Sequence, residues 1–264
     1  MNYDLQIKNG QVITENGLQR VDLSIKDGKI VQIGKASQSD TSTHEIDAQG
    51  QYVLPGFLDP HVHLNDPGLT NSEDFYTGTC AAAAGGITTV LEHPLTFPLP
   101  DNIAAFEEKK GIGKQKAIIN FGLFGACSAQ NQEEMKKMLQ SGAVAFKTFL
   151  TYSHEIPKLD DGQLLDRMEF LASYPTVLAI HCENNDIVEY CTAKLQAMGK
   201  IKPENYPDGR PEIAELEAVS RMCMLAMHTG CKTLSSIPAK GSNRHRCRCG
   251  SCDFKSEPGM DCKR

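Results

Sequence analysis

The sequence has no apolar run that approaches the roughly 18 to 20 residues needed for a membrane-spanning helix. Its first residues, Met1–Asp4, carry neither the basic nor the apolar segment of a secretory signal. Both absences argue against a membrane or secreted protein. We therefore expect a cytoplasmic protein that makes no membrane contact.

The chain also lacks an excess of positive charge. Its 264 residues carry a formal net charge of -6 at pH 7, and 40% of them are hydrophobic. A protein of this charge presents no basic field to nucleic acid, which favours chemistry on a small molecule. The length suits one large globular domain or two modest ones.

The ten cysteines are unevenly distributed. Half of them lie singly in apolar segments, as reduced core thiols do. The other half lie within residues 231–264, where the periodic apolar pattern ends; they are Cys231, Cys247, Cys249, Cys252 and Cys262. This change in composition marks a boundary.

Residues 1–54 read as a small β domain. Asn9-Gly10 and Asp27-Gly28 each lie between alternating apolar residues. Because such dipeptides favour the turns that join antiparallel strands, each predicts a hairpin.

From Pro55 to residue 238 apolar strands alternate with helical stretches, which is typical of βα units and a parallel sheet. Ser72 is the expected cap of the first helix, and Gly230 the expected stop of the last. The predicted strands are 57–63, 87–92, 117–124, 144–150 and 177–181, with a sixth beginning near Cys231. The predicted helices are 72–84, 132–140, 162–173 and 212–228.

His61-Val62-His63 ends the first of these strands. Alternate side chains on a strand point to the same face, so both imidazoles can reach one metal ion. A pair this close also arises by chance or as hydrogen-bonded surface residues. The spacing alone therefore leaves a metal site and a surface pair open.

Two later strands bring further titratable groups toward the same edge. Lys147 lies between phenylalanines in the fourth strand, and His181 closes the fifth. A buried lysine needs an explanation, because an unpaired ammonium is costly in apolar surroundings. It either snorkels or pairs with a carboxylate, or it is chemically modified and bridges metals. Convergence of these groups at strand ends favours a metal site.

Several motifs together resemble the cyclic amidohydrolases of the amidohydrolase superfamily, which include dihydroorotase, allantoinase, hydantoinase and dihydropyrimidinase. The resemblance covers residues 1 to about 238. It rests on Lys8–Gly10, Asp27–Ile30, Leu54–His63, Gly85–Thr89, Phe146–Phe149, His181–Asn184, Arg210-Pro211 and Glu217. The implied fold class is α/β: an incomplete TIM-like (β/α)8 metal-dependent hydrolase barrel with a small N-terminal β-sandwich part.

The resemblance also implies a role for each site residue. His61 and His63 would bind one divalent ion, commonly zinc, and His181 a second. Lys147 would be carboxylated by carbon dioxide and bridge the two metals. Tyr152 matches a tyrosine that hydrogen-bonds the developing oxyanion in hydantoinase-like members; the alternative is an ordinary loop tyrosine.

The substrate is expected to be a small cyclic amide whose ring opens by C–N hydrolysis, in a homo-oligomeric full-length enzyme. Dihydroorotases carry an arginine where this chain has Asn65, the candidate substrate-binding residue. The Asn65–Gly68 stretch and Arg210-Pro211 resemble allantoinase, whereas Glu92-His93 and Tyr152 resemble dihydropyrimidinase or hydantoinase. We favour an allantoinase-like ureide or a hydantoin ring over a pyrimidine.

The chain departs from the family pattern after Lys232. The expected strand ending in a fourth histidine is missing before Ser235-Ser236, and no later aspartate matches the expected general base. Residues 239–264 form an irregular Cys/Arg-rich tail that we predict to be disordered. It could be a zinc module or a basic tail. An out-of-frame or mis-spliced end is favoured, because it accounts at once for the lost histidine, the missing strands and the change in composition. Little activity is then expected, and a catalytically inactive metal-binding remnant is the alternative function.

Overall fold

The computed structural model describes residues 1–35, 37, 39–153 and 156–235, so the expectations for the 239–264 tail lie outside the described residues. The chain divides into two compact units, Met1–Phe57 and Leu58–Arg264. The sequence predicted a boundary near residue 54. Each unit is described separately below.

The first unit is a five-stranded sheet in which β1 is central. Its order is β3-β2-β1-β4, and β5 also pairs with β1. β1 pairs antiparallel with β2 and parallel with β4 and β5. The strands are β1 (Asn2–Thr14), β2 (Gly17–Lys26), β3 (Lys29–Ile33), β4 (Thr41–Asp47) and β5 (Tyr52–Val53).

One of the two predicted hairpins is confirmed and the other is wrong. Asp27 and Gly28, with φ of 52° and 71°, turn β2 into β3. Asn9, with φ of 57°, instead forms a bulge inside the continuous strand β1. Its backbone N–H donates to Asp22, and a Cβ on Gly10 would lie 2.7 Å from Val53. Asn9 therefore supplies the left-handed backbone of a bulge, and Gly10 allows Val53 to approach the strand closely.

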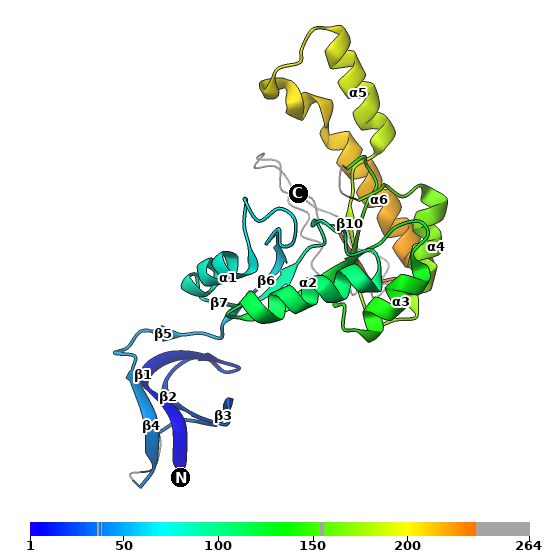
Figure 1. The fold of residues 1–264 in the computed structure, drawn as a ribbon. Helices are drawn as coiled ribbons and strands as arrows, with labels where there is room; N and C mark the ends of the chain where they lie inside the picture. Colours follow the sequence, from blue (N-terminus) through cyan, green and yellow to red (C-terminus); the bar gives the residue numbers. More distant parts are fainter. Residues whose placement is uncertain (36, 38, 154–155, 236–264) are drawn as a thin grey trace. The chain divides into compact units, whose positions relative to one another are not determined.

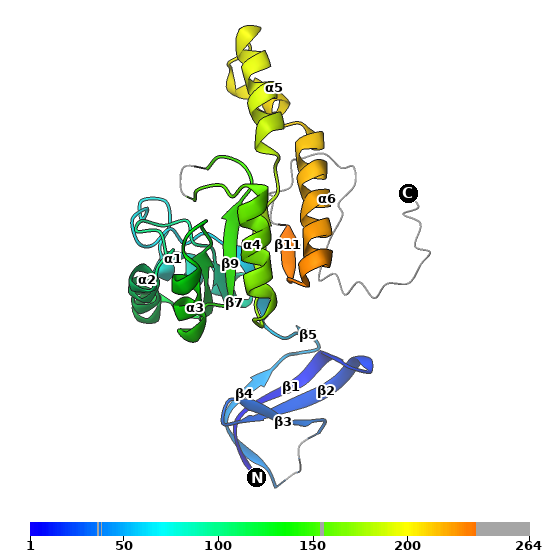
Figure 2. The same ribbon diagram turned by 90° about the vertical axis from the view of Figure 1, so that its right-hand side faces the viewer.

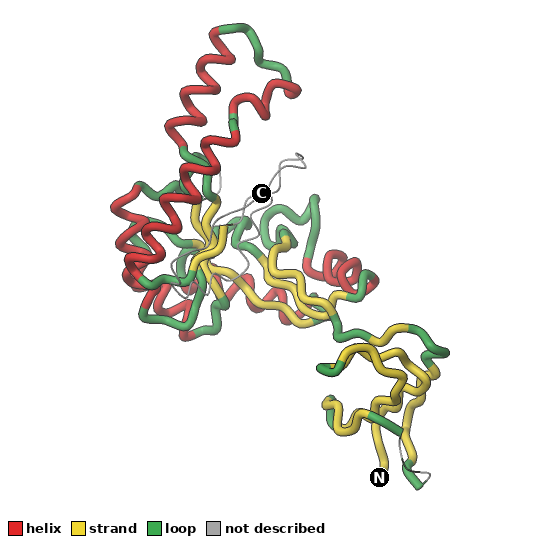
Figure 3. Tube along the Cα trace, turned by 180° about the vertical axis from the view of Figure 1, so that it is seen from behind, coloured by secondary structure: helices red, strands yellow, loops and turns green. Residues whose placement is uncertain are grey.

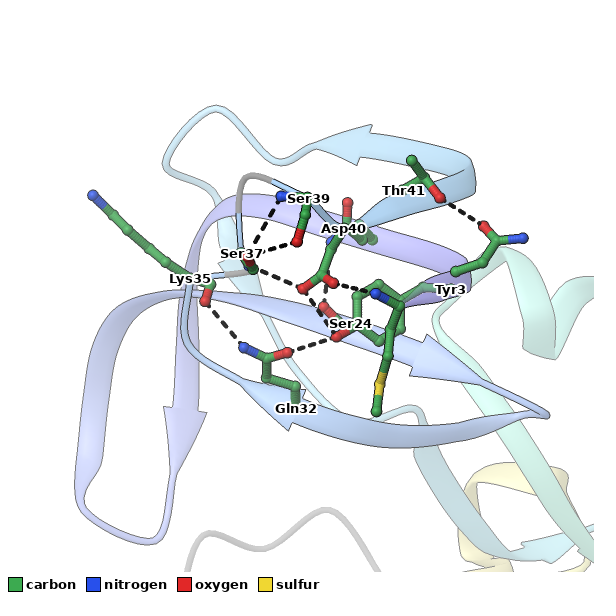
Figure 4. A network of polar contacts seen from close by, with 11 residues as sticks. Tyr3, Ser24, Gln32, Lys35, Ser37, Ser39, Asp40 and Thr41 are labelled. Atoms are coloured by element: carbon green, nitrogen blue, oxygen red, sulfur yellow. Dashed lines mark hydrogen bonds and ion pairs between the residues drawn. The ribbon is translucent and has the colours of Figure 1, made fainter.

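A polar network holds the connection between β3 and β4 onto the start of β1 (Figure 4). The Tyr3 hydroxyl donates to Gln32 Oε1 at 2.7 Å. Asp40 accepts hydrogen bonds from the N-terminal ammonium and from the Ser37 backbone N–H. These contacts satisfy the polar ends of side chains whose stems lie in the sheet.

The second unit contains a parallel sheet of six strands in sequential order, β6 to β11 (Figures 1 and 3). Its strands are β6 (Phe57–Val62), β7 (Ile87–Glu92), β8 (Asn120–Ala126), β9 (Ala145–Phe149), β10 (Leu178–His181) and β11 (Thr233–Ser235). Each of the five predicted strands is present within a few residues. The arrangement is a curled, incomplete (β/α) barrel, as the sequence predicted.

Helices connect these strands. Most of them lie along one face of the sheet, whereas residues 185–209 project beyond it (Figure 2). The helices are α1 (Phe75–Ala84), α2 (Ile103–Lys116), α3 (Gln132–Gln140), α4 (Asp161–Ala172), α5 (Asn185–Ala197), the 3₁₀ segment η1 (Pro203–Gly209) and α6 (Glu212–Thr229). The predicted Ser72 cap is wrong: Asp74 caps α1 by accepting from Thr77 N–H at 2.7 Å. The sequence reading also missed α2, which has weak apolar periodicity and contains two glycines, and α5.

β11 takes the sixth place in the sheet although it has only three residues. Thr233, Leu234 and Ser235 pair in parallel with Leu178, Ala179 and Ile180 of β10. The sequence predicted that the sixth strand begins near Cys231, which is confirmed. It also predicted that the ligand-bearing strand had been lost. The structure shows that the residues after Lys232 pair in its place, and β11 contains no histidine.

Apolar side chains pack on both faces of the parallel sheet from β7 to β10, whereas β6 is largely exposed. Phe146, with its side chain fully buried, belongs to the large cluster between strands and helices. Ala145, Ala179 and Phe124 form a smaller cluster on the opposite face. Since side chains alternate along β9, Lys147 and Phe149 share the face of Ala145. The candidate site therefore lies on the face opposite the helices.

The buried thiols are expected to react slowly. Complete burial raises the pKa of the Cys127 thiol to about 12, whereas Cys80 and Cys191 are only partly buried. Because the thiolate is the nucleophile, we expect iodoacetamide at neutral pH to alkylate Cys80 and Cys191 at least about tenfold faster than Cys127. Peptide mass spectrometry on the native chain measures these rates, with urea-unfolded protein as the control. Equal rates in the native chain would contradict the buried position of Cys127.

Gly230 ends α6 as predicted, with φ of 74° and its N–H donating to the Ala226 carbonyl. A Cβ is disfavoured in this left-handed conformation, so Gly230→Ala should lower the free energy of unfolding by ~1 kcal/mol. The matched control is Gly111→Ala inside α2, where an added Cβ meets nothing within 4 Å. That change should raise stability by up to about 1 kcal/mol. Urea denaturation of both variants checks the opposite signs.

Among the helices that the structure describes, none is long and apolar enough to span a membrane.

Candidate metal centre

Four residues singled out from the sequence lie at or near the carboxyl ends of β6, β9 and β10. His61 and His63 come from β6 and the residue that follows it, Lys147 from the middle of β9, and His181 from the last position of β10. Parallel strands bring these ends to one edge of the sheet. His61 is close enough to His63, Lys147 and His181 for their charges to interact.

A third histidine joins the pair from β6. His93, directly after β7, stacks on His61 with ring centroids 3.7 Å apart and lies 5.6 Å from His63. Phe124 of β8 stacks on the other side of His93 at 4.2 Å. The backbone holds this arrangement, because His93 N–H donates to the Val62 carbonyl at 3.0 Å.

Of these three histidines only His93 is buried, whereas His61 and His63 are exposed. Partial desolvation lowers the pKa of His61 to about 4, with further lowering by Lys147 and His63. Burial together with His61 lowers the pKa of His93 to about 2. Neither ring nitrogen of His93 has a hydrogen-bond partner within the described part of the chain. Neutral imidazole nitrogens with available lone pairs are suited to metal binding.

Lys147 is 2% exposed and lies 5.0 Å from the centroid of the Phe149 ring. Burial lowers the pKa of its ammonium to about 7. A substantial fraction of the side chain is then the neutral amine at physiological pH, which is the form that reacts with electrophiles. The sequence left snorkelling open as one explanation for this lysine, and its burial excludes that.

His181 is held by a buried carboxylate. Its Nε2 lies 2.8 Å from Glu183 Oε2, and Arg210 forms an ion pair with the same oxygen. The Phe149 ring stacks on His181 with centroids 4.9 Å apart, so this ring contacts both His181 and Lys147. Glu183 and Arg210 therefore orient the imidazole that the sequence proposed as a ligand.

The two non-metal candidates occupy loops at the same strand ends. Asn65 is partly buried, with a left-handed φ of 57° in the turn after His63. Tyr152 follows β9, is 64% exposed, and lines a cavity of about 270 Å³ with Arg210 and Asn185. Its backbone N–H donates to the Asn185 side chain at 3.0 Å. A tyrosine in a cavity wall can reach a ligand, and the role of Tyr152 stays a prediction.

The candidate ligands lie near one another, but their side chains are not arranged around one metal position. Within residues 1–35, 37, 39–153 and 156–235, no three His, Cys, Asp or Glu side chains are placed to hold one metal ion. The stacking of His61 on His93 explains part of this, because it aligns the rings face to face. The donor chemistry nevertheless fits a metal, since the imidazole nitrogens and the buried Lys147 amine lie on one face of the sheet.

Sequence reasoning did not place His93, Glu183 or Arg210 in the site. His93 could have been found by the same logic as His61, because it directly follows a predicted strand. Glu183 and Arg210 belong to the motifs that carried the resemblance. Their contact could not be found from local patterns, because the two residues lie 27 positions apart in the sequence.

Comparison with known proteins agrees with this fold. Residues 50–242 match the Dihydro-orotase-like family, and residues 1–49 match the N-terminal domain of the urease alpha-subunit. A curled, incomplete parallel (β/α) barrel with histidines at its strand ends and a buried lysine in a neighbouring strand is the framework of a barrel enzyme. The chain belongs to the Dihydro-orotase-like family and, within it, to the cyclic amidohydrolase group.

Individual relatives point to the same group. The chain is 36% identical over 235 residues to the allantoinase of Desulfitobacterium hafniense (strain Y51), covering 88% of this chain and 52% of that protein. It is 32% identical over 237 residues to the L-hydantoinase of Paenarthrobacter aurescens, covering 88% and 51%. The solved L-hydantoinase (dihydropyrimidinase) from Arthrobacter aurescens superimposes with a TM-score of 0.83 at 32% identity, covering 88% and 52%. The chain spans about half the length of the curated relatives it matches.

Proposed function

We propose that this site, in a full-length form of the protein, carries out metal-dependent hydrolysis of a cyclic amide C–N bond, with an allantoin-like ureide ring as the favoured substrate. The observation that carries the proposal is the buried Lys147 on the same sheet face as His61, His63 and His181. Histidines alone would also suit a structural metal site. A buried lysine with a pKa of about 7 is better explained by reaction chemistry.

The side chains supply a donor set for two divalent ions, which we propose to be zinc. His61 and His63 would bind one ion and His181 the other. The neutral Lys147 amine would add to carbon dioxide, forming an N–C bond and releasing a proton, so that the resulting carbamate offers two bridging oxygens. This step converts a costly buried cation into an anion that the metals neutralise.

When bound, the ions would polarise the ring carbonyl and lower the pKa of a water molecule. Glu183 and Arg210 would keep His181 oriented toward the metal. The Tyr152 hydroxyl would donate to the oxygen that gains charge as the ring opens. Asn65 would hydrogen-bond a polar group of the ring from the turn beside His63.

Two observations support the proposed substrate ring: the residue types in the site and the names of the relatives. Asn65 offers an amide, not a positive charge, so it suits a neutral ring better than the carboxylate of dihydroorotate. The relatives include allantoinases and hydantoinases, which supports a ureide or hydantoin ring. Dihydropyrimidine and dihydroorotate rings are the alternatives. A homo-oligomeric full-length form and a cytoplasmic location also stay predictions.

A second candidate is a metal-binding chain without catalysis. One observation favours it: β11 occupies the sixth sheet position and contains neither a histidine nor a carboxylate. His61, His63, Lys147 and His181 could then retain a metal without a positioned base.

Ring opening and metal content, measured together, separate the candidates. The 264-residue chain is dialysed against zinc, cobalt or manganese with bicarbonate, bound metal is counted by mass spectrometry, and allantoin, hydantoin and dihydrouracil are each offered. We expect bound metal and little turnover by this chain. Robust hydrolysis would reject the second candidate. Absence of turnover on all three rings by a full-length homologous chain would reject the first, and absence of bound metal would reject both.

A further inference from the structure

The turn that follows β6 is held by a carboxylate from the next strand. Glu92, at the end of β7, accepts a hydrogen bond from the Leu64 backbone N–H at 2.7 Å. The neighbouring Asn65 N–H lies near enough to this carboxylate to favour its charged form. Residues 63–66 are here called the His63–Asp66 turn. Asn65 adopts a φ of 57° in this turn, directly after the Leu64 N–H that Glu92 holds.

Glu92 is in turn held by a lysine from α2. Lys109 Nζ lies 3.0 Å from Glu92 Oε1 and 3.0 Å from the His93 carbonyl oxygen. Both side chains are only 1% exposed. The pair therefore joins three segments distant in sequence: α2, the end of β7 with His93, and the His63–Asp66 turn.

A second lysine of the same helix reaches the far side of this turn. Lys116, two helical turns after Lys109, lies with its Nζ 2.7 Å from Asp66 Oδ2. The Asp66 side chain is 4% exposed. Residues seven apart lie on the same face of a helix. Lys109 and Lys116 therefore hold the turn from one face of α2, through the carboxylates of Glu92 and Asp66.

Core stabilisation alone does not explain this arrangement. A buried ion pair contributes little net stability, and apolar residues of similar volume replace such pairs without loss. Glu92, however, accepts a hydrogen bond from the buried Leu64 backbone N–H, and removing this acceptor would leave the donor unsatisfied and loosen the turn. His63 and Asn65, the proposed ligand and substrate contact, are the side chains whose direction depends on that turn.

We propose that Glu92, held by Lys109, is a positioning residue that fixes the His63–Asp66 turn and so aims His63 and Asn65. The inference rests on the proposed function for the roles of those two side chains. Glu92 itself touches neither metal nor substrate in this assignment. It acts through the backbone.

Two double variants test the proposal without leaving an unpaired charge in the core. Glu92→Gln with Lys109→Met keeps a neutral oxygen acceptor, whereas Glu92→Leu with Lys109→Met removes it at similar volume. In the leucine variant we expect the Leu64 and Asn65 amides to exchange with solvent at least about tenfold faster. Its affinity for cobalt(II) should fall by at least about tenfold. The glutamine variant should stay within about threefold of the parent chain in both measurements.

Glu107→Gln is the matched control, because Glu107 pairs with Lys110 on the exposed side of the same helix. It should change neither measurement. Equal amide exchange in the leucine and glutamine variants would overturn the proposal. Faster exchange with unchanged cobalt affinity would support the positioning of the turn and reject His63 as a ligand. The exchange result also stands if the parent chain binds no cobalt, which would reject the proposed function alone.

Discussion

Replacing Lys147 with methionine is expected to lower the affinity of the chain for zinc or cobalt by at least roughly a hundredfold. Methionine fills the same volume in the apolar strand but cannot form a carbamate, so the bridging oxygens are lost. The remaining histidines would hold at most a single ion weakly. Competition with a chelator of known affinity, in buffer with and without bicarbonate, measures the change.

The bicarbonate dependence separates a modified lysine from an ordinary one. Metal affinity of the parent chain should rise with bicarbonate, and that of Lys147→Met should not. Lys136→Met, a change at an exposed position of α3, is the control and should leave the affinity unaltered. Equal metal affinity in the Lys147 variant and the parent chain would reject the bridging role.

Truncating Phe146 to alanine is expected to lower the free energy of unfolding of the second unit by about 3 to 5 kcal/mol. The ring is fully buried between β9 and the helices. It packs over Gly125, where an added Cβ would lie 2.6 Å from it, and beside Met138. Neighbours this close-packed cannot collapse into the space that the ring leaves.

Urea denaturation followed by circular dichroism measures this loss. Tyr190→Ala is the control, because that ring is 67% exposed on α5 and its removal should cost within about 0.5 kcal/mol. A Phe146→Ala variant as stable as Tyr190→Ala would show that β9 does not pack on the helices as described. Since Phe146 and Lys147 point to opposite faces, the two substitutions also separate stability from metal binding.

The alternation of strands and helices was predictable because it depends on local patterns. Ile87–Glu92 is recovered to the residue, and Asp27-Gly28 and Gly230 do what their short-range chemistry requires. Local patterns fail where a neighbour from elsewhere in the chain decides. Asn9 has the residue type of a hairpin turn, but the pairing of β1 with β2, β4 and β5 makes it a bulge.

The candidate site was partly predictable for a related reason. In a parallel sheet every strand end reaches the same edge, so His61, His63 and His181 could be grouped before any contact was known. Two contacts could not be predicted: the stacking of His93 on His61 and the ion pair between Lys109 and Glu92. Each depends on the distance between two elements, and sequence spacing carries no such distance.

By itself, the sequence determined the class of this protein: a parallel βα architecture with a histidine pair at its first strand end and a lysine inside its fourth strand. Those features follow from side-chain periodicity and turn chemistry, which act over a few residues. Only the tertiary structure decided that Lys147 is buried on the face opposite the helices, that Glu183 holds His181, and that β11 takes the sixth strand position. The physical reason is that burial and pKa depend on what packs against a group, and in this chain those neighbours come from other strands and helices.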